Sequence, residues 1–283
     1  MKENKTVIFV DSGCDVPQSY LDKYPIKVIP LRVAYETDQH IDSVELAADV
    51  YRRFPAEIPH TSTPVVQDFY DMVDEVRAEG YQNIIGIFIS SNLSSTYQTG
   101  RIVLGEQEDL NTFVLDSKNI SIGAGMLAMW AAVQLDNGVS FEEVCEMLPG
   151  KVKDSKVFFY MDTLEYLRKG GRIGAVSSVV GSLLKIKPII SCNEDGIYYT
   201  VEKIRGAKAG ISKLIDHAVK YAGDAPAWLT VMNGGAPQIE DEIVPKLMDS
   251  IKDSKLVGTG QITASLAVHT GPGLAGIGVL VNP

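Results

Sequence analysis

Short apolar segments alternate with amphipathic helical segments through roughly the first 155 residues, and this alternation restricts the chain to few folds. A chain that alternates strand and helix in this way forms a parallel sheet with right-handed crossovers and helices on both faces. We therefore expect an α/β fold. The predicted strands lie at 6–12, 83–90 and 112–117, and the predicted helices at 60–80, 95–106 and 123–138.

Two local signals add detail to this pattern. Residues 26–33 predict a further strand, and Pro30 within it predicts a strand at the edge of the sheet or at a bulge. Asp42 and Glu45 have the spacing of a capping box, which predicts a helix that starts at Asp42.

The pattern changes after residue 154. Residues 175–186 predict a short apolar helix, and 187–204 predict a hairpin that turns at Asp195 and Gly196. Helices and strands then alternate again, and a hairpin within such a pattern indicates a mixed sheet. The sequence therefore predicts two α/β domains, residues 1–154 with a parallel sheet and residues 155–283 with a mixed sheet and helices.

Composition excludes several classes of function. The net charge is -10 and the pI about 4.9, which argues against a nucleic-acid partner. Cys14, Cys145 and Cys192 are far apart and predict neither a zinc site nor a disulfide framework. The apolar run near the start is too short for a signal peptide, and no run reaches the ~20 residues that span a bilayer. We expect a soluble, cytoplasmic protein without a metal or cofactor.

Two hydroxyl-rich segments precede predicted helices. Thr63 is the expected N-cap of the first helix, which leaves Thr61 and Ser62 unexplained at its positive end. Ser94 and Ser95 follow an apolar strand, and capping explains only one of them. Ligands of open α/β folds bind at the carboxyl ends of the strands, so both segments could hold one anion. From spacing alone, capping and anion binding both stay open.

His269 stands between an apolar run and a glycine-rich turn. A core or loop histidine explains it from the sequence alone, unless a buried anion lies nearby. The GxGxxG match in this turn predicts no dinucleotide site, because the chain ends before the βαβ unit that the motif opens. The serine clusters and His269 could instead form a triad, so a serine- and histidine-dependent lipid hydrolase is the alternative function.

Basic residues are clustered in two short segments of this otherwise acidic chain. They are either solvated ends of helices or a docking patch for a phosphate-bearing partner or an anionic surface. The two groups are Arg168, Lys169 and Arg172, and Lys203, Arg205 and Lys208.

Six motifs together resemble the DegV family, in order, at the family's usual spacing and over essentially the whole chain. Ser95 is often glycine in that family, so the resemblance favours Ser94 over Ser95 for a side-chain role. The motifs are "VDSGCDVP" near the start, "TSTP" at 61–64, "ISSNLSSTYQ" at 89–98, "YLRKGGRIG" at 166–174, "LLKIKPII" at 183–190 and "HTGPGLAGIG" at 269–278.

The resemblance implies a fatty-acid-binding protein whose ligand lies in a tunnel between two α/β domains. The ligand would be a long-chain fatty acid such as palmitate, stearate or oleate, and the tail would lie against residues 157–161 and 175–186. The implied carboxylate contacts are Thr61, Ser62, Ser94 or Ser95, and His269.

The resemblance also implies a partner. Family members act as the carrier subunit of a bacterial fatty acid kinase and have no catalytic centre of their own. A separate ATP-dependent subunit phosphorylates the bound carboxylate, and the acyl phosphate enters phospholipid synthesis. Arg172 and Arg205 match basic positions at the mouth of the site that serve docking of the partner or of phosphate. Transient contact with a membrane surface is compatible with this role.

Overall fold

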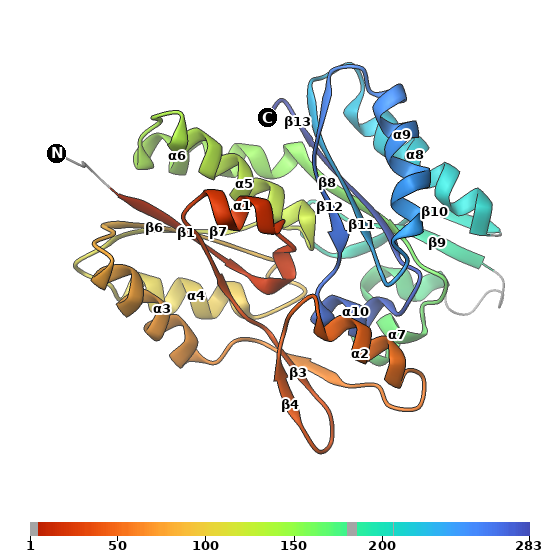
Figure 1. The fold of residues 1–283 in the computed structure, drawn as a ribbon, viewed down its shortest axis with the longest axis horizontal. Helices are drawn as coiled ribbons and strands as arrows, with labels where there is room; N and C mark the ends of the chain where they lie inside the picture. The colour runs from red at the N-terminus through yellow and green to blue at the C-terminus, as the bar shows by residue number, and fades with distance from the viewer. Residues whose placement is uncertain (1–4, 180–185, 206) are drawn as a thin grey trace.

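The computed structural model describes residues 5–179, 186–205 and 207–283, with side chains for all of these except 177–179, 186, 205, 207 and 208. The predicted α/β fold is confirmed. Two sheets lie side by side, one built from the first half of the chain and one from the second (Figure 1). A small antiparallel sheet lies near their junction, at the bottom of the same view.

The first sheet is parallel throughout, with the strand order β2-β1-β6-β7. Alternate residues of a strand face opposite sides of the sheet. Phe9 therefore packs in one buried cluster with α3 and α4, and Ile8 packs in another with α5. Helices cover both faces, as the alternation predicts. The elements are β1 (Thr6–Asp11), β2 (Ile26–Ile29), β6 (Asn83–Phe88), β7 (Asn111–Asp116), α3 (Val66–Ala78), α4 (Thr96–Gly105) and α5 (Ile122–Asp136).

Pro30 divides the predicted strand at 26–33 into two. The part before it is β2, an edge strand as predicted, but the part after it is β3 (Arg32–Ala34) in the small sheet. Proline has no N–H for a ladder bond, so the chain leaves the first sheet at this point. β3 pairs on both sides, with β4 (Gln39–Ile41) and β5 (His60–Ser62).

The second sheet is mixed, with the order β10-β9-β8-β13-β11-β12. β11 pairs parallel with β12, and the other neighbours are antiparallel. The predicted hairpin turn at Asp195 and Gly196 is confirmed, because the Asn193 N–H bonds the Ile197 carbonyl across it at 2.9 Å. The strands are β8 (Ser155–Tyr160), β9 (Ile186–Cys192), β10 (Tyr198–Arg205), β11 (Ala227–Asn233), β12 (Ser254–Gln261) and β13 (Ala275–Val281).

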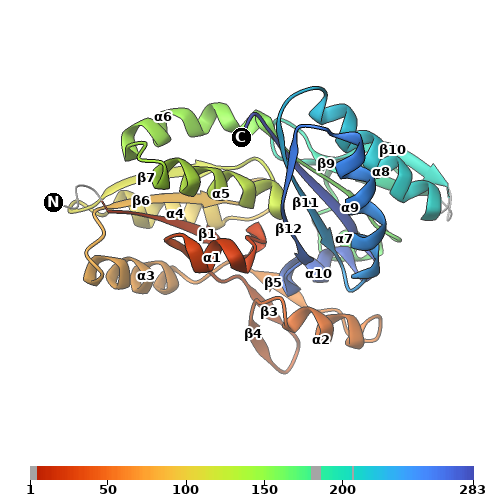
Figure 2. The ribbon, with the colours of Figure 1, turned by 45° about the horizontal axis from the view of Figure 1, so that its top comes forward.

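Helix α5 joins the two sheets. Its residues 122–132 are all buried, and it contacts β1 and β6 of the first sheet and β8 and β13 of the second (Figure 2). One buried apolar cluster therefore runs from Ile8 and Ile87 to Phe159 and Met232. The second sheet begins at Ser155, but the division into domains at residue 154 stays a prediction.

The remaining helices cover the second sheet or close its loops. Helices α8 (Ala207–Ala222) and α9 (Gln238–Ser250) pack on the face away from α5. Of the predicted helix at 175–186, residues 175–179 lie in the 3-10 turn Gly174–Val179, residues 180–185 lie outside the described residues, and Ile186 begins β9. The others are α1 (Gln18–Lys23), α2 (Leu46–Arg53), α6 (Phe141–Lys151), α7 (Glu165–Lys169), α10 (Ala264–Thr270) and 3-10 turns at Ser12–Cys14 and Val152–Asp154.

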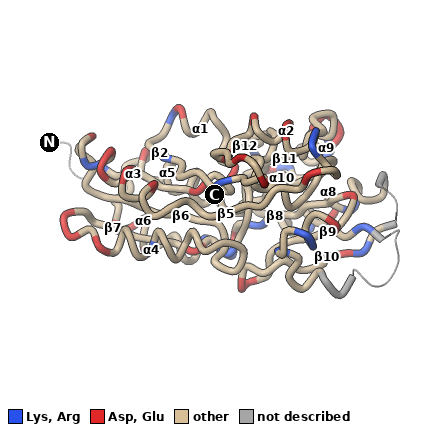
Figure 3. Tube along the Cα trace, turned by 90° about the horizontal axis from the view of Figure 1, so that it is seen from below, with Lys and Arg blue, Asp and Glu red and all other residues tan. Residues whose placement is uncertain are grey.

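Acidic and basic residues are interspersed along the described trace (Figure 3). Among the helices of the described residues, none is long and apolar enough to cross a membrane.

A glycine on α5 tests the packing between the sheets. A Cβ on Gly125 would lie 2.3 Å from the Cys14 carbonyl oxygen, so Gly125→Ala must push α5 away from the 3-10 turn that follows β1. We expect a loss of about 1–3 kcal/mol in the free energy of unfolding, measured by urea denaturation.

Gly150→Ala is the matched control. Gly150 lies in helix α6 with no atom within 4 Å of the added methyl, so the same change should be neutral or slightly stabilising there. Equal stabilities of the two variants would contradict the tight contact at Gly125.

Candidate functional site

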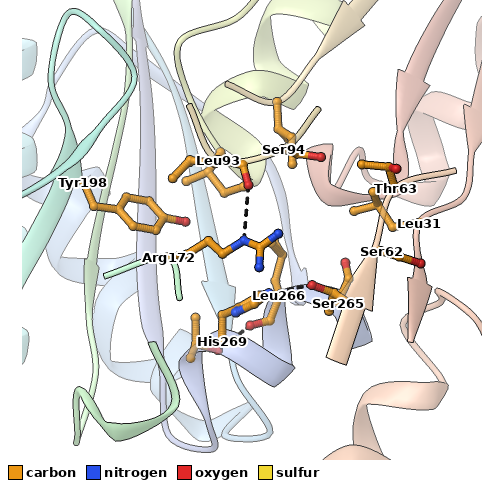
Figure 4. A pocket seen from close by; sticks show the side chains of 14 residues that line it. Leu31, Ser62, Thr63, Leu93, Ser94, Arg172, Tyr198, Ser265, Leu266 and His269 are labelled. Carbon is orange, nitrogen blue, oxygen red and sulfur yellow. Dashed lines mark hydrogen bonds between the residues drawn. The ribbon is translucent and has the colours of Figure 1, made fainter. Parts of the chain in front are cut away.

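A pocket opens where loops at the carboxyl edge of the first sheet face α10 and the start of β10 (Figure 4). It encloses about 530 Å³ of space, part of it open to solvent. Both halves of the chain contribute to it. The first half supplies Leu31, Thr61, Ser62, Thr63, Ile89, Leu93, Ser94 and Ile120, and the second supplies Arg172, Tyr198, Ser265, Leu266, His269 and Thr270.

Thr61 and His269 meet in this pocket. Thr61 Oγ1 lies 2.8 Å from His269 Nε2, although the two residues are 208 positions apart. Thr61 lies on β5, where its backbone pairs with Val33, and His269 lies near the end of α10. The structure therefore brings together two of the residues predicted to bind a carboxylate.

The environment of His269 keeps its imidazole neutral. Burial, together with the charges of Arg172 and His60, lowers the pKa of His269 to about 4. Its Nδ1 atom is buried without a hydrogen-bond partner and packs against Gly170, where a Cβ would lie 2.0 Å from it. An unpaired buried N–H is rarer than an unpaired acceptor, which favours the tautomer with the proton on Nε2. Nε2–H then donates to Thr61 and leaves the Thr61 O–H free to donate into the pocket.

Ser94 is held by the start of α4. Its Oγ lies 2.8 Å from Thr96 Oγ1 and accepts a hydrogen bond from the Thr96 N–H at 3.3 Å. Because Thr96 is fully buried, these contacts fix the Ser94 side chain at the pocket wall. Ser94 thus combines a capping contact with a place in the pocket.

The other predicted hydroxyls are placed differently. Ser62 lines the pocket but is exposed, whereas Ser95 is exposed and lies outside the lining. The predicted N-cap at Thr63 is wrong, because α3 starts at Val66 and the Val65 N–H donates to Asp68 Oδ2 at 2.9 Å. The reason is that residues 60–62 extend as β5 beside β3 and delay the helix. Ligand roles for Ser62 and Ser95 stay predictions.

The two predicted basic residues also differ. Arg172 lines the pocket and is exposed, so it lies at the mouth. Its Nη1 donates to the Gly170 carbonyl at 2.9 Å and its Nε to the Leu93 carbonyl at 3.4 Å. These bonds hold the guanidinium between α7 and the loop that carries Ser94 (Figure 4). Arg205 ends β10, and its side chain lies outside the described part of the chain.

A second cavity lies beside the pocket. The space among its lining residues is about 360 Å³, part of it open to solvent, and it shares Ile120, Tyr198, Leu266 and Thr270 with the pocket. Its remaining lining is largely apolar and includes Val157 and Phe159 of β8, which belong to the segment that the resemblance implies for the tail, and contact with a tail stays a prediction. The full set of its other residues is Ser121, Val157, Phe159, Met232, Ile262, Leu274 and Gly276. The pocket that contains the hydroxyls and the more apolar cavity are therefore neighbours that share part of their wall.

Sequence reasoning did not identify the neighbours of His269 on α10. Leu266, His269 and Thr270 have the i, i+3, i+4 spacing of one helix face, and all three line the pocket. That spacing could have indicated them once a helix was predicted at 264–270. Tyr198 had no comparable local signal, because its place in the pocket depends on how the hairpin packs.

The geometry gives little support to a hydrolase. A triad needs a group that orients the histidine toward the nucleophile. Within the described ranges, the hydrogen bond of His269 goes to Thr61, and no carboxylate holds its Nδ1 atom. The described residues also contain no cluster of three His, Cys, Asp or Glu that could hold a metal.

The neutral state of His269 predicts a pH-dependent stability. Because its pKa falls from 6.5 to about 4 on folding, the unfolded chain binds more protons between these values. The stabilisation is therefore fully present above pH 6.5 and is lost as the pH falls. Between pH 7.5 and pH 5 the wild type should lose about 2 kcal/mol more of its free energy of unfolding than His269→Gln.

Urea denaturation of both proteins at the two pH values measures this difference. Contributions from other titrating groups are shared and cancel in the comparison. Parallel losses in the two proteins would show that His269 titrates normally.

Comparison with known proteins identifies the family. The DegV family model, described as a family of uncharacterised proteins, matches residues 5–282. A DegV domain-containing protein of Clostridium acetobutylicum is 39% identical, covering 96% of this chain and 98% of that protein. A fatty acid-binding protein of Thermotoga maritima is 31% identical, covering 98% of each chain. The structure of a stearic acid-binding protein from Eubacterium ventriosum matches with a TM-score of 0.87 at 26% identity, over 97% of each chain. The chain belongs to the DegV family, as its motifs predict.

Proposed function

We propose that this protein binds one long-chain fatty acid, such as palmitate, stearate or oleate, between its two predicted domains. The observation that carries the proposal is that a pocket with several hydroxyls in its wall lies beside a largely apolar cavity and shares four lining residues with it. A fatty acid has the same two parts, an anionic carboxylate and an apolar tail. The T. maritima and E. ventriosum relatives, described as binding fatty acid and stearic acid, support this proposal.

The carboxylate would lie among Thr61, Ser94 and Arg172. The two hydroxyls donate hydrogen bonds to its oxygens, and the guanidinium at the mouth supplies the opposite charge. His269 acts through Thr61, since its bond to Oγ1 directs the Thr61 O–H into the pocket. Ser62 would contact the head group from the exposed rim. A buried carboxylate without such donors is strongly disfavoured.

The tail would supply most of the binding free energy. Burying about fifteen methylenes at ~0.8 kcal/mol each contributes on the order of 12 kcal/mol. Lost translational and rotational freedom opposes this by roughly 4–15 kcal/mol. The head-group contacts then serve mainly to orient the acid and to avoid an unpaired buried charge.

We further propose that the protein presents the carboxylate to a separate ATP-dependent kinase subunit. Phosphoryl transfer needs a carboxylate oxygen that an incoming nucleotide can reach. The exposed Arg172 at the pocket mouth and the buried apolar cavity behind it support an orientation with the carboxylate outward. Arg172 would then face both the head group and the partner, and Arg205 would extend the docking surface. The acyl phosphate product is a substrate for phospholipid synthesis.

Removing two donors tests the head-group site. Thr61→Val with Ser94→Ala should weaken fatty-acid binding at least tenfold, because each bond to a charged group contributes about 1.5–3 kcal/mol. Isothermal titration calorimetry, or displacement of a fluorescent fatty acid, measures the dissociation constant. Ser95→Ala is the matched control, since this neighbouring hydroxyl lies off the pocket lining. Equal affinities of the double variant and the control would contradict the site.

Acyl phosphate formation tests the presentation step. The purified protein mixed with fatty acid and ATP should form no acyl phosphate. Acyl phosphate should form once the kinase subunit is added. Hydroxylamine traps the product as a hydroxamate that mass spectrometry detects. Release of fatty acid from an acyl ester by the protein alone, lost in His269→Ala, would favour the hydrolase instead.

A further inference from the structure

Helix α10 carries Leu266, His269 and Thr270 into the pocket. In sequence it belongs to the second sheet, because it connects β12 to β13. Its first backbone N–H groups, however, are bonded to the first half of the chain. The Thr263 N–H donates to Asp15 Oδ1 at 2.9 Å, the Ala264 N–H to the Ser43 carbonyl at 3.0 Å, and the Ser265 N–H to Asp42 Oδ1 at 2.7 Å.

Asp42 ties two walls of the pocket together. Its Oδ2 accepts hydrogen bonds from Ser265 Oγ and from Ser12 Oγ, each at 2.6 Å. Ser12 Oγ in turn accepts the N–H of Leu31 at 3.0 Å. Ser265 and Leu31 both line the pocket, from α10 and from the first half. The predicted helix cap at Asp42 is therefore wrong, because α2 starts at Leu46 and the Asp42 carboxylate points into the interior.

Asp15 makes a second tie of the same kind. While Oδ1 accepts from Thr263, Oδ2 accepts a hydrogen bond from Ser121 Oγ. Ser121 precedes α5 and lines the apolar cavity. Asp15 thus connects the start of α10 to the start of the central helix.

These carboxylates hold backbone and hydroxyl donors rather than a cation. Asp11, a third buried carboxylate nearby, accepts the Ile89 N–H at 2.9 Å. Burial raises the pKa of all three, to about 7 for Asp11 and Asp15. Among the ion pairs of the described residues, none involves Asp11, Asp15 or Asp42, and these residues form no metal-binding group. Other titratable groups that face these carboxylates are Cys14, Tyr198 and Tyr51, and the Tyr51 hydroxyl accepts a hydrogen bond from Gln261.

We propose that Asp42, assisted by Asp15, is a positioning residue of the fatty-acid site: it anchors the start of α10 so that His269 meets Thr61. This inference rests on the proposed function for its ligand and adds a determinant that touches no ligand atom. One turn of helix separates Ser265 from His269, so a slip at the anchor moves the imidazole directly.

The reason is geometric. Hydrogen bonds to a charged acceptor are shorter and stronger than those to a neutral one, and Asp42 receives three of them within 2.6 to 2.7 Å. Asparagine at this position keeps the size but replaces one acceptor oxygen by a donor. The Ser265 and Ser12 hydroxyls must then reorient, and the start of α10 loosens. His269 would lose its bond to Thr61 and become more exposed to water.

The pKa of His269 reports this movement without any ligand. The largest charge contributions to it come from Arg172 and His60, and not from the carboxylates. Removal of a negative charge alone would lower a histidine pKa, whereas exposure to water raises it toward 6.5. The sign of the change therefore separates repositioning from simple loss of charge.

The test measures the His269 pKa by NMR of labelled imidazoles in the full-length protein, and fatty-acid affinity by displacement of a fluorescent fatty acid. The chain has four histidines, so His269→Gln assigns the signal. We expect Asp42→Asn to raise the His269 pKa by about one unit and to weaken palmitate binding about tenfold. Ser265→Ala keeps its N–H bond to Asp42 and should give smaller changes in the same direction. Asp11→Asn, which removes a buried carboxylate not bonded to α10, should leave the His269 pKa unchanged or slightly lowered, because only a negative charge is lost.

An unchanged or lowered His269 pKa in folded Asp42→Asn overturns the proposal, and so does an equal rise in Asp11→Asn. If Asp42→Asn does not fold, the His269 pKa is measured in Ser265→Ala instead. An unchanged or lowered pKa in that variant then overturns the proposal. Failure of the wild type to bind palmitate would refute the proposed function, while the pKa measurement would still decide whether Asp42 positions His269.

Discussion

The burial of one apolar helix between two sheets is the contact on which the rest of the structure depends. Residues 122–132 of α5 are all buried, so both sheets must present apolar faces to them. That requirement places the carboxyl edge of the first sheet opposite the second sheet. The pocket and the apolar cavity lie at this junction, and Ile120, just before α5, lines both. The same burial that stabilises the fold thus creates a space that both halves of the chain line.

A site for a buried anion must be stable when the anion is absent. A buried cation without a partner would be costly, whereas neutral hydroxyls and a neutral imidazole can bond one another. Thr61 with His269 and Ser94 with Thr96 are such pairs, and the charged Arg172 stays at the exposed mouth. The carboxylates that anchor α10 are also satisfied by hydroxyl and backbone donors. Neutral donors inside and charge at the rim would allow the proposed fatty-acid site to be stable both empty and filled.

Local sequence patterns predicted the strands and turns whose formation depends mainly on neighbouring residues. The strands predicted at 6–12, 83–90 and 112–117 and the turn at Asp195 and Gly196 follow from β-branched runs and from turn residues, and they are confirmed, whereas the strand predicted at 26–33 is divided at Pro30. Asp42 has capping-box spacing, but its bonds go to residues 30 and 223 positions away, which no local rule detects. For the same reason, sequence spacing did not decide whether His269 is a core histidine or contacts an anion. Only the family resemblance placed His269 and Thr61 in the same predicted site. Residues 60–62 were predicted as the start of a helix, but they form a strand. Their pairing with β3 is a tertiary contact, which the local sequence pattern does not reveal.

Mass spectrometry of the lipid extracted from the purified, natively folded protein tests the central claim most directly. Within the described residues, a pocket with hydroxyls in its wall lies beside a largely apolar cavity and shares four lining residues with it. The account predicts a single unesterified long-chain fatty acid in a one-to-one ratio with the chain. Recovery of only esterified lipid, or failure to take up added fatty acid at all, would contradict it.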